Sequence, residues 1–327
     1  MARASQDGVG LVAAKDLYVL TVMGLMRGVA LTGSPRAREL VARAVAACSF
    51  HLSRTKRRGS EATLSRVFGA RLSPCRRRVI VRRAFYEFWH DAFSLLPLRG
   101  AAGPDVGELV GARHLERALG DGRGVILWIS NNFGRTIALK RTLHERGFPV
   151  HKVHAANHLG GFRGARDPDT WVQRRIITPF FDAHEQPVVA GVVSITPRSL
   201  RYTRQLDARL RANGIVCVAG DATLGRRRLP LTFLGTSARL STGAVTLART
   251  TGAAVVPAFC IRGRGGRSRV VIEAPIAVPA DLDREQGVEQ VLRRFVERLE
   301  RYGRRYPSLY LNWHLLGPPS PPPGPPA

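Results

Sequence analysis

The chain has few cysteines, and their spacing suggests neither a metal site nor a disulfide framework. There are four, Cys48, Cys75, Cys217 and Cys260, and none lies within four residues of another, so no CxxC zinc pattern exists. Cys217 and Cys260 stand in apolar, strand-like runs, where a thiol behaves as a small buried hydrophobe. This pattern predicts a protein of a reducing compartment without a metal site.

Long hydrophobic runs are also missing. The stretch 9–31 is fairly apolar, but Lys15, Asp16 and Arg27 interrupt it. Its longest uninterrupted part, 17–26, is about half of the ~20 residues that a helix needs to cross a bilayer. The N-terminus also lacks the short apolar segment and small-residue cleavage site of a secretory signal. We therefore expect an interfacial or buried helix here.

Acidic residues are scarce relative to basic ones. Lys and Arg total 51 and Asp and Glu total 24, which gives a net charge of +27. Such a field attracts polyanions: nucleic acid, anionic lipid headgroups or an acidic carrier protein. An Arg-rich composition without any specific partner would give the same charge. Because 44% of the residues are hydrophobic, the chain can bury a core, which excludes a disordered polycation.

Several catalytic signatures are absent. The sequence contains no GxGxxG dinucleotide loop, no GxxxxGK[ST] phosphate loop, no GxSxG nucleophile elbow and no HExxH pair. It therefore lacks the usual marks of nucleotide enzymes, serine hydrolases and zinc enzymes. We predict no cofactor and no metal.

The first 105 residues predict helices. Residues 1–50 are rich in Ala, Leu and Val, whereas 51–75 are basic and less regular. A helix over 74–98 has an apolar face at three- and four-residue spacing, formed by Val81, Phe85, Phe88, Trp89, Ala92, Phe93 and Leu96. Its first half carries Arg76, Arg77, Arg78, Arg82 and Arg83. This combination suits a helix at a membrane surface, but on this pattern alone an ordinary amphipathic helix that faces the core with solvated arginines is favoured.

From about residue 110 the pattern alternates between strands and helices. Apolar runs predict strands at 124–130, 150–155, 188–195, 215–219, 254–261 and 270–272. Helical patterns lie between and after them, at 136–146, 197–213, 241–251 and 284–301. The alternation predicts an α/β fold with a central, mostly parallel mixed sheet flanked by helices. We expect an N-terminal helical, membrane-docking region at 1–105, the α/β domain at 106–316 and a disordered Pro-rich tail at 317–327.

A polar turn follows the first strand of this sheet. Ligands of α/β folds bind at the carboxyl ends of strands, where the next helix presents free N–H groups. The turn therefore predicts a ligand site that contains Asn131, Asn132, Phe133, Gly134 and Arg135.

At this turn the chain resembles the lysophospholipid acyltransferase superfamily, and in particular its branch of bacterial lipid A lauroyl/myristoyl acyltransferases. That branch has a His-Phe-Gly-Asn-Trp-Glu type of turn after a buried strand, and Phe133 and Gly134 match it. Asn132 stands where the family has its catalytic His, and Ile137 stands where it has the paired Asp or Glu.

The resemblance continues along the chain. A strand ends in Gly-Asp-Ala at 220–222, a Phe-Leu-Gly turn follows at 233–235, and the segment 306–314 is similar to the family's closing Pro…Trp-x-His. In order and spacing these pieces cover roughly residues 15–315. The resemblance implies an acyltransferase that moves a fatty acyl chain from acyl-ACP or acyl-CoA to a glycolipid or lysophospholipid acceptor.

In the family's mechanism a His removes the acceptor's proton and a carboxylate orients that His. Asn132 cannot serve as this base, because an amide does not titrate near neutral pH. His154 and His158 come at the end of the second predicted strand and after it, and Asp221 follows another strand. If the strands are parallel, all three lie at the same sheet edge and are candidates to serve as the base, although each also fits a plain strand, loop or turn role. Arg135 and Arg198 are candidate contacts for a phosphate or for the thioester carrier.

The resemblance and the charge together define the expected partners. Acyl-ACP and acyl-CoA are both anionic, which suits the net charge of +27. We expect a peripheral protein on the anionic, cytoplasmic face of the inner (plasma) membrane. The alternative is a catalytically degenerate relative that binds lipid or acyl chains. Nucleic acid is an unlikely partner, because the aromatics lie on an apolar stripe and no recognised reading element is present.

Overall fold

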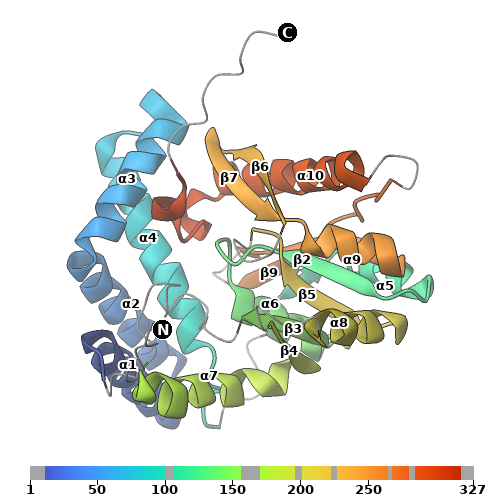
Figure 1. Ribbon diagram of the computed structural model, residues 1–327. Coiled ribbons are helices and arrows are strands. Elements are labelled where there is room, and N and C mark those ends of the chain that lie inside the picture. The colour runs from blue at the N-terminus through green and yellow to red at the C-terminus, as the bar shows by residue number, and fades with distance from the viewer. Residues whose placement is uncertain are drawn as a thin grey trace, which may run out of the picture.

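The computed structural model describes residues 12–100, 106–155, 170–195, 201–221, 227–263, 267–279 and 284–317. A curved layer of N-terminal helices lies beside an α/β unit (Figure 1). That layer consists of α1 (Ala14–Thr32), α2 (Pro35–Leu52), α3 (Arg54–Phe68) and α4 (Pro74–Phe93), with the short helix η1 (Gly69–Arg71) between the last two. Among the described helices, none combines the length and the apolar character needed to cross a bilayer.

Local sequence sets where these helices begin. Ser34 and Ser73 precede α2 and α4, and their hydroxyls accept the N–H groups of Ala37 and Arg76 at 3.2 and 3.3 Å. A proline occupies the first turn of both helices, where its missing N–H costs nothing. The basic segment that we predicted to be less regular forms α3. Its buried side is partly polar, with Ser60 and Thr63, so the apolar periodicity was weak.

The aromatic stripe of α4 is part of the core. Val81, Phe85 and Trp89 are 1%, 6% and 4% exposed, and the helix ends at Phe93 instead of residue 98. The prediction that this stripe faces a membrane is therefore wrong. Its alternative, a helix that packs inward with its arginines at the surface, is confirmed, because Arg76, Arg78, Arg82 and Arg83 are exposed.

The central sheet has the strand order β1-β9-β8-β2-β5-β3-β4. All neighbouring pairs are parallel except β8 and β9, which form an antiparallel hairpin. This confirms the predicted mostly parallel mixed sheet. The strands are β1 (Glu108–Val110), β2 (Val125–Ile129), β3 (Val150–Ala155), β4 (Gly191–Ile195), β5 (Ile215–Ala219), β8 (Ala254–Arg262) and β9 (Ser268–Ile272).

Helices cover both faces of the sheet (Figure 1). They are α5 (Ala112–Gly120), α6 (Thr136–Glu145), α8 (Arg201–Arg211), α9 (Gly243–Thr251) and α10 (Arg284–Arg305). The other helical elements are α7 (Thr178–Glu185) and the short helices η2 (Gln173–Ile177), η3 (Gln186–Val188), η5 (Pro307–Leu309) and η6 (Trp313–Leu315); η2 packs on α1 and η6 packs on α3. A separate antiparallel pair, β6 (Arg228–Phe233) and β7 (Thr236–Ser241), was not predicted. It turns through Leu234 and Gly235, both at positive φ.

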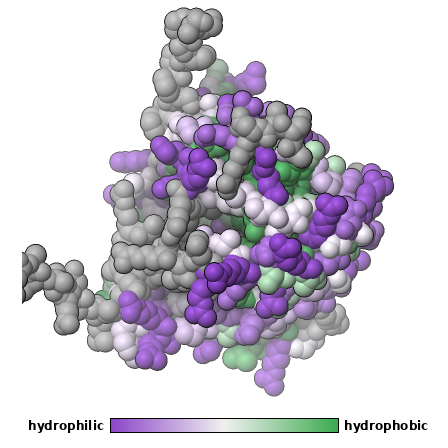
Figure 2. Space-filling view, turned by 45° about the vertical axis from the view of Figure 1, so that its right-hand side comes forward, coloured by the Kyte–Doolittle hydropathy of each residue, from purple (hydrophilic) through white to green (hydrophobic). Residues whose placement is uncertain are grey.

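Alternate residues of the central strand enter two cores. Ile126 and Trp128 belong to one core, and Leu127 and Ile129 belong to the other. Trp128 stacks on Phe295 of α10 with ring centroids 4.3 Å apart. Burial on both sides explains the continuous apolar run of β2. Outside these cores, Figure 2 shows hydrophilic side chains surrounding smaller apolar areas.

Two buried histidines lead to a prediction about acid stability. Burial, and after it the positive charges of the nearby Arg135 and Lys56, respectively, lower the pKa of His90 and of His314 to about 4. The unfolded chain would protonate both near pH 6.5, whereas the folded protein keeps them neutral until about pH 4. The unfolded state thus binds more protons in this window, so the free energy of unfolding should fall as the pH drops from 6.5 to 4.

Urea unfolding at pH 4.5 and pH 7 checks this prediction in the wild type and in His314→Gln. We expect the variant to lose less stability between the two pH values than the wild type. Equal losses in both proteins would show that His314 does not contribute to the acid sensitivity.

Candidate active site

The polar turn meets a carboxylate from the neighbouring strand. β2 and β5 are parallel neighbours, with Ile129 opposite Ala219, so the residues that follow them emerge side by side. Asp221, 9% exposed, uses one carboxylate oxygen to accept the Ser130 hydroxyl at 2.5 Å, the Asn132 side-chain amide at 2.9 Å and the Asn132 N–H at 3.2 Å. Its other oxygen accepts the Asn131 N–H at 2.9 Å. The predicted proximity of Asp221 and Asn132 is therefore present.

The C-terminal segment closes the other side of the turn. Asn312 donates its side-chain amide to Oδ1 of Asn132 at 2.8 Å, and the Leu311 N–H bonds the Asn132 carbonyl at 2.7 Å. Lys56 of α3 donates to Oδ1 of Asn312 at 3.1 Å. Asp221 and Asn312 thus hold the Asn132 side chain from both ends, and Lys56 bonds Asn312 in turn.

Gly134 is required by close backbone packing. Its φ is +78°, and a Cβ at this position would lie 2.3 Å from the Cys260 carbonyl oxygen. The Gly134 N–H donates to the Leu309 carbonyl at 2.8 Å. Next to it, Phe133 is 3% exposed and packs on Phe259. These two predicted substrate-binding residues therefore shape the turn from inside, and the structure gives their side-chain positions no exposed surface.

The negative charge of Asp221 affects the pKa of the nearby Tyr310 phenol. Burial, and after it the charge of Asp221, raise the pKa of Tyr310. Tyr310 therefore stays protonated and neutral across the physiological range. Four N–H and O–H donors surround Asp221 itself, and donors of this kind are what a carboxylate needs when it is withdrawn from water.

The start of α6 is capped from within the protein. Asp91 of α4 accepts the N–H groups of Ile137 and Ala138, each at 3.1 Å. Burial raises the pKa of Asp91, and these two hydrogen bonds oppose the rise. We expected free N–H groups here for a ligand, but these two are occupied. A carboxylate does lie beside position 137, and it bonds the backbone of α6.

Arg135 belongs to a buried ion-pair network. It is 2% exposed, and its Nε and Nη2 donate to one oxygen of Glu87 at 2.9 and 2.6 Å. Arg262 of β8 donates to the other oxygen of Glu87 at 2.9 Å. The network fastens the turn to α4 and β8. This placement favours a structural role for Arg135 over the predicted contact with substrate.

Glu87→Gln should destabilise the protein strongly. Glu87 is 1% exposed, so the change leaves Arg135 buried without the carboxylate to which it is hydrogen-bonded. Breaking a buried pair by removing one partner costs about 3–5 kcal/mol. Urea unfolding measures the loss. Arg269→Met is the matched control, because it removes an exposed pair with Glu108 and should cost about 1 kcal/mol or less. A loss for Glu87→Gln no larger than the control would contradict the prediction.

The structure describes some of the remaining predicted site residues but not others. Asn131 is exposed at the turn. His154 lies on β3 opposite Ser194 of β4, and only its backbone is described. His158 and Arg198 lie outside the described residues. Sequence reasoning missed Lys56 and Asn312; the C-terminal motif was a signal for Asn312, but nothing in the sequence connects Lys56 to the turn.

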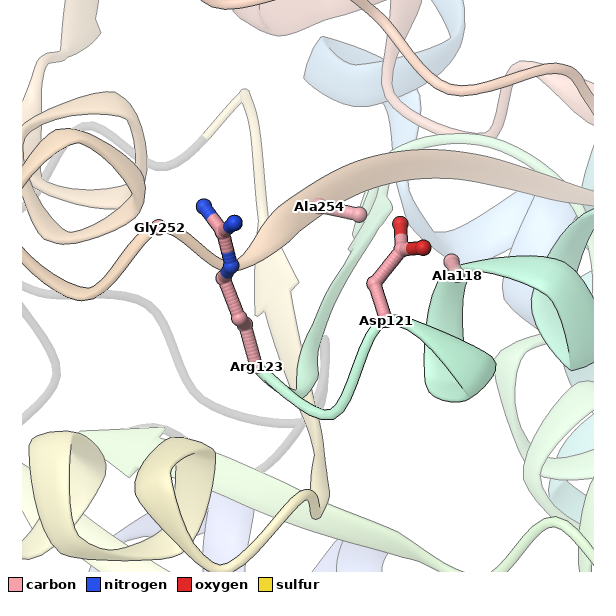
Figure 3. Close-up of a pocket in the computed structure, with 5 residues that line it drawn as sticks. All are labelled: Ala118, Asp121, Arg123, Gly252 and Ala254. Atoms are coloured by element: carbon pink, nitrogen blue, oxygen red, sulfur yellow. The ribbon is translucent and has the colours of Figure 1, made fainter.

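A pocket lies at the opposite edge of the sheet. It is lined by Ala118, Asp121, Arg123, Gly252 and Ala254 (Figure 3). Arg123 precedes β2 and Ala254 begins β8, so the pocket lies at the amino ends of these strands. It is therefore separate from the turn. In the described ranges no three or more His, Cys, Asp or Glu side chains are grouped so as to hold a metal ion.

Comparison with known proteins gives three findings. The family model for bacterial lipid A biosynthesis acyltransferases matches residues 193–315, which include Asp221 and Asn312. A phosphatidylinositol mannoside acyltransferase of Mycolicibacterium smegmatis is 24% identical over 241 residues, 72% of this chain and 69% of the relative. The Mycobacterium tuberculosis protein of the same name is 25% identical over 240 residues, 72% of this chain and 67% of the relative.

A solved structure is also similar. The 1-acyl-sn-glycerophosphate acyltransferase of Thermotoga maritima aligns with a TM-score of 0.34 and 15% identity, over 82% of this chain and 99% of that chain.

Proposed function

We propose that this chain, a lipid A acyltransferase-like member of the acyltransferase superfamily, transfers a fatty acyl chain from acyl-ACP or acyl-CoA to a hydroxyl of a glycolipid or lysophospholipid. The relatives that it resembles are named phosphatidylinositol mannoside acyltransferases. A lipid acceptor of that glycosylated, anionic kind is the first to test.

The observation that best supports the proposal is the contact between Asp221 and Asn132. Asn132 occupies the position of the family's catalytic His, and a carboxylate lies within 2.9 Å of its side chain. An ionisable group is thus present at the reaction centre although the His is absent. Among the proposed bases, Asp221 is the one whose side-chain contact with Asn132 is described, so we assign it the role ahead of His154 and His158.

The chemistry that these residues support is addition of the acceptor oxygen to the thioester carbonyl, followed by elimination of the thiolate. Asp221 takes the proton from the acceptor hydroxyl while the oxygen's electron pair forms a bond to the thioester carbonyl carbon. Asn132 has two amide hydrogens; one bonds Asp221, and the other is assigned to the oxyanion that develops on the carbonyl. When the carbonyl re-forms, the carbon–sulfur bond breaks, and the thiolate leaves and takes up the proton.

A specific observation also favours a second function. An amide at 132 and an aliphatic side chain at 137 remove both members of the family's His and acid pair. A degenerate relative that binds lipid or acyl chains without transfer would have this composition. The two functions differ in the role of Asp221, which the enzyme needs as a base and the binder needs only as a turn anchor.

Membrane association receives support from α1 in place of α4. Leu17, Leu25 and Leu31 are 59%, 41% and 66% exposed on this helix. Trp171, 48% exposed, follows Thr170, whose hydroxyl bonds Asp16 of α1 at 2.6 Å. Exposed leucines with a nearby Trp are suited to the headgroup boundary of a bilayer, and the net charge of +27 favours anionic lipid. The four cysteines are free, which fits the cytoplasmic face of the inner membrane.

Replacement of Leu17, Leu25 and Leu31 by Gln should weaken binding to vesicles of anionic phospholipid by about tenfold or more. Each leucine that enters the bilayer contributes roughly 1.5–3 kcal/mol to binding. Vesicle co-sedimentation at fixed salt measures the change. Leu315→Gln is the control, because Leu315 is 66% exposed and lies outside the N-terminal helices. Equal binding by the triple variant and the control would exclude α1 as the contact surface.

The test of the proposed function is a transfer assay. Purified protein is mixed with radiolabelled acyl-ACP or acyl-CoA of several chain lengths and with detergent-solubilised phosphatidylinositol mannoside or lysophospholipid. Label that appears in the lipid fraction supports the acyltransferase. Binding of these lipids without transfer from any donor would support the degenerate binder.

A further inference from the structure

Four side chains form an unbroken hydrogen-bonded chain between the N-terminal helices and the turn. Lys56 donates to Asn312 at 3.1 Å, Asn312 donates to Asn132 at 2.8 Å, and Asn132 donates to Asp221 at 2.9 Å. Lys56 and Asn312 are 256 residues apart in the sequence. The chain has an ammonium at one end and a carboxylate at the other.

The two ends fix the direction of every bond between them. An ammonium can only donate and an ionised carboxylate can only accept, whereas an asparagine amide does both. With Lys56 at one end, Asn312 must turn its oxygen to Lys56 and its NH₂ to Asn132. Asn132 then turns its oxygen to Asn312 and its NH₂ to Asp221. If either amide were rotated by 180°, two donors or two acceptors would face each other.

We propose that Lys56 is a positioning residue for acyl transfer, which acts through Asn312 to keep the Asn132 NH₂ directed at Asp221; this rests on the proposed function. The geometry around Lys56 suits a fixed charge. Its ammonium lies 5.1 Å and 5.7 Å from the ring centroids of Phe85 and Phe88, over both rings. Held in this way, it orients Asn312 at little cost in side-chain entropy.

The packing of α3 also supports this role. A Cβ on Gly59 of α3 would lie 3.1 Å from the Cβ of His314, so α3 approaches the segment that contains Asn312 closely. The N-terminal helices therefore contribute a charged group to the site and do more than cover the sheet. Hydrogen bonds in series polarise one another, so loss of the ammonium should also weaken the bond from Asn132 to Asp221.

The first test compares Lys56→Met with Lys56→Arg in the acyl-transfer assay. A hydrogen bond to a charged group is worth about 1.5–3 kcal/mol, so Lys56→Met should lower kcat by about tenfold or more. KM should change less than twofold, because Lys56 acts on the turn. Lys56→Arg keeps a cationic donor and should recover most of the loss. Arg58→Met removes an exposed cation from the same helix and should leave kcat unchanged. A loss in KM alone, or no recovery by Arg, would overturn the proposal.

The second test is a double-mutant cycle with Asn312→Leu. If Lys56 acts through Asn312, the double variant Lys56→Met/Asn312→Leu should be no slower than Asn312→Leu alone. Additive losses would show that Lys56 acts independently of Asn312 and would overturn the proposal.

Urea unfolding of the wild type, the two single variants Lys56→Met and Asn312→Leu, and the double variant separates this proposal from the proposed function. A wild type without transferase activity would overturn the proposed function and the positioning role of Lys56 with it. Coupling between Lys56 and Asn312 in the free energy of unfolding would still establish the hydrogen-bonded chain, and additivity there would refute the chain as well.

Discussion

Asp221→Asn is expected to lower the rate of acyl transfer by about 10²–10⁴-fold, the usual effect of removing a positioned general base. The substitution keeps the size of the side chain but removes its ability to take up a proton. It also replaces one acceptor oxygen by an NH₂, and this NH₂ would face the Ser130 hydroxyl and the Asn132 amide or else the Asn131 N–H. The reaction centre should therefore lose both its base and part of its hydrogen bonding.

The transfer assay, with kcat and KM measured separately, checks this expectation. Asp121→Asn is the matched control, because Asp121 lies in the pocket at the opposite edge of the sheet (Figure 3). Thermal unfolding of both variants identifies any loss that is due to misfolding. Activity of a folded Asp221→Asn protein within about threefold of the wild type would rule out Asp221 as the base.

The second large effect is expected from Asn132→His. The side chain at 132 lies between the amide of Asn312 and the carboxylate of Asp221. An imidazole there would have a carboxylate to hold one ring N–H, which is the arrangement that sets the tautomer of a catalytic His. Its other nitrogen would titrate near neutral pH. We expect transfer to become faster by about 10²-fold, the lower end of the range for a positioned base.

Asn131→His is the control for this gain. Asn131 is exposed, and Asp221 contacts it through its backbone N–H. A His at 131 should therefore leave the rate unchanged. If the wild type only binds lipid and Asn132→His creates transfer, the chain is a degenerate member whose geometry remains intact. If Asn132→His and Asn132→Ala both leave the rate unchanged, the turn is not the reaction centre.

The contrast between α4 and α1 bears on how the protein would meet a membrane. The helix with the more membrane-like sequence, α4, buries its aromatic stripe, whereas α1 leaves leucines exposed. A Phe/Trp stripe beside arginines fits a protein core as well as a bilayer surface. In both environments, removing the same apolar area from water is favourable. The buried stripe of α4 therefore identifies the core-facing interpretation, which periodicity alone favoured but could not establish.

Three cases show how much of the site the sequence predicted. Asp221 and Asn132 were predicted to approach each other because carboxyl ends of parallel strands share one sheet edge. The prediction about Arg135 was not supported, since its pairing with Glu87 depends on where α4 packs. Lys56 could not be predicted at all, because its contact joins residues 256 apart in the sequence.

The sequence by itself determined the α/β architecture, because strand and helix periods and the Gly and Pro boundaries are local properties of the chain. It also determined that position 132 carries an amide and position 137 an aliphatic side chain. Only the tertiary structure decided that β5 lies beside β2, that Asp221 touches Asn132, and that Lys56 of α3 reaches Asn312. Strand order and helix docking depend on how the surfaces of strands and helices that are distant in the sequence pack together. Local sequence patterns do not contain that information.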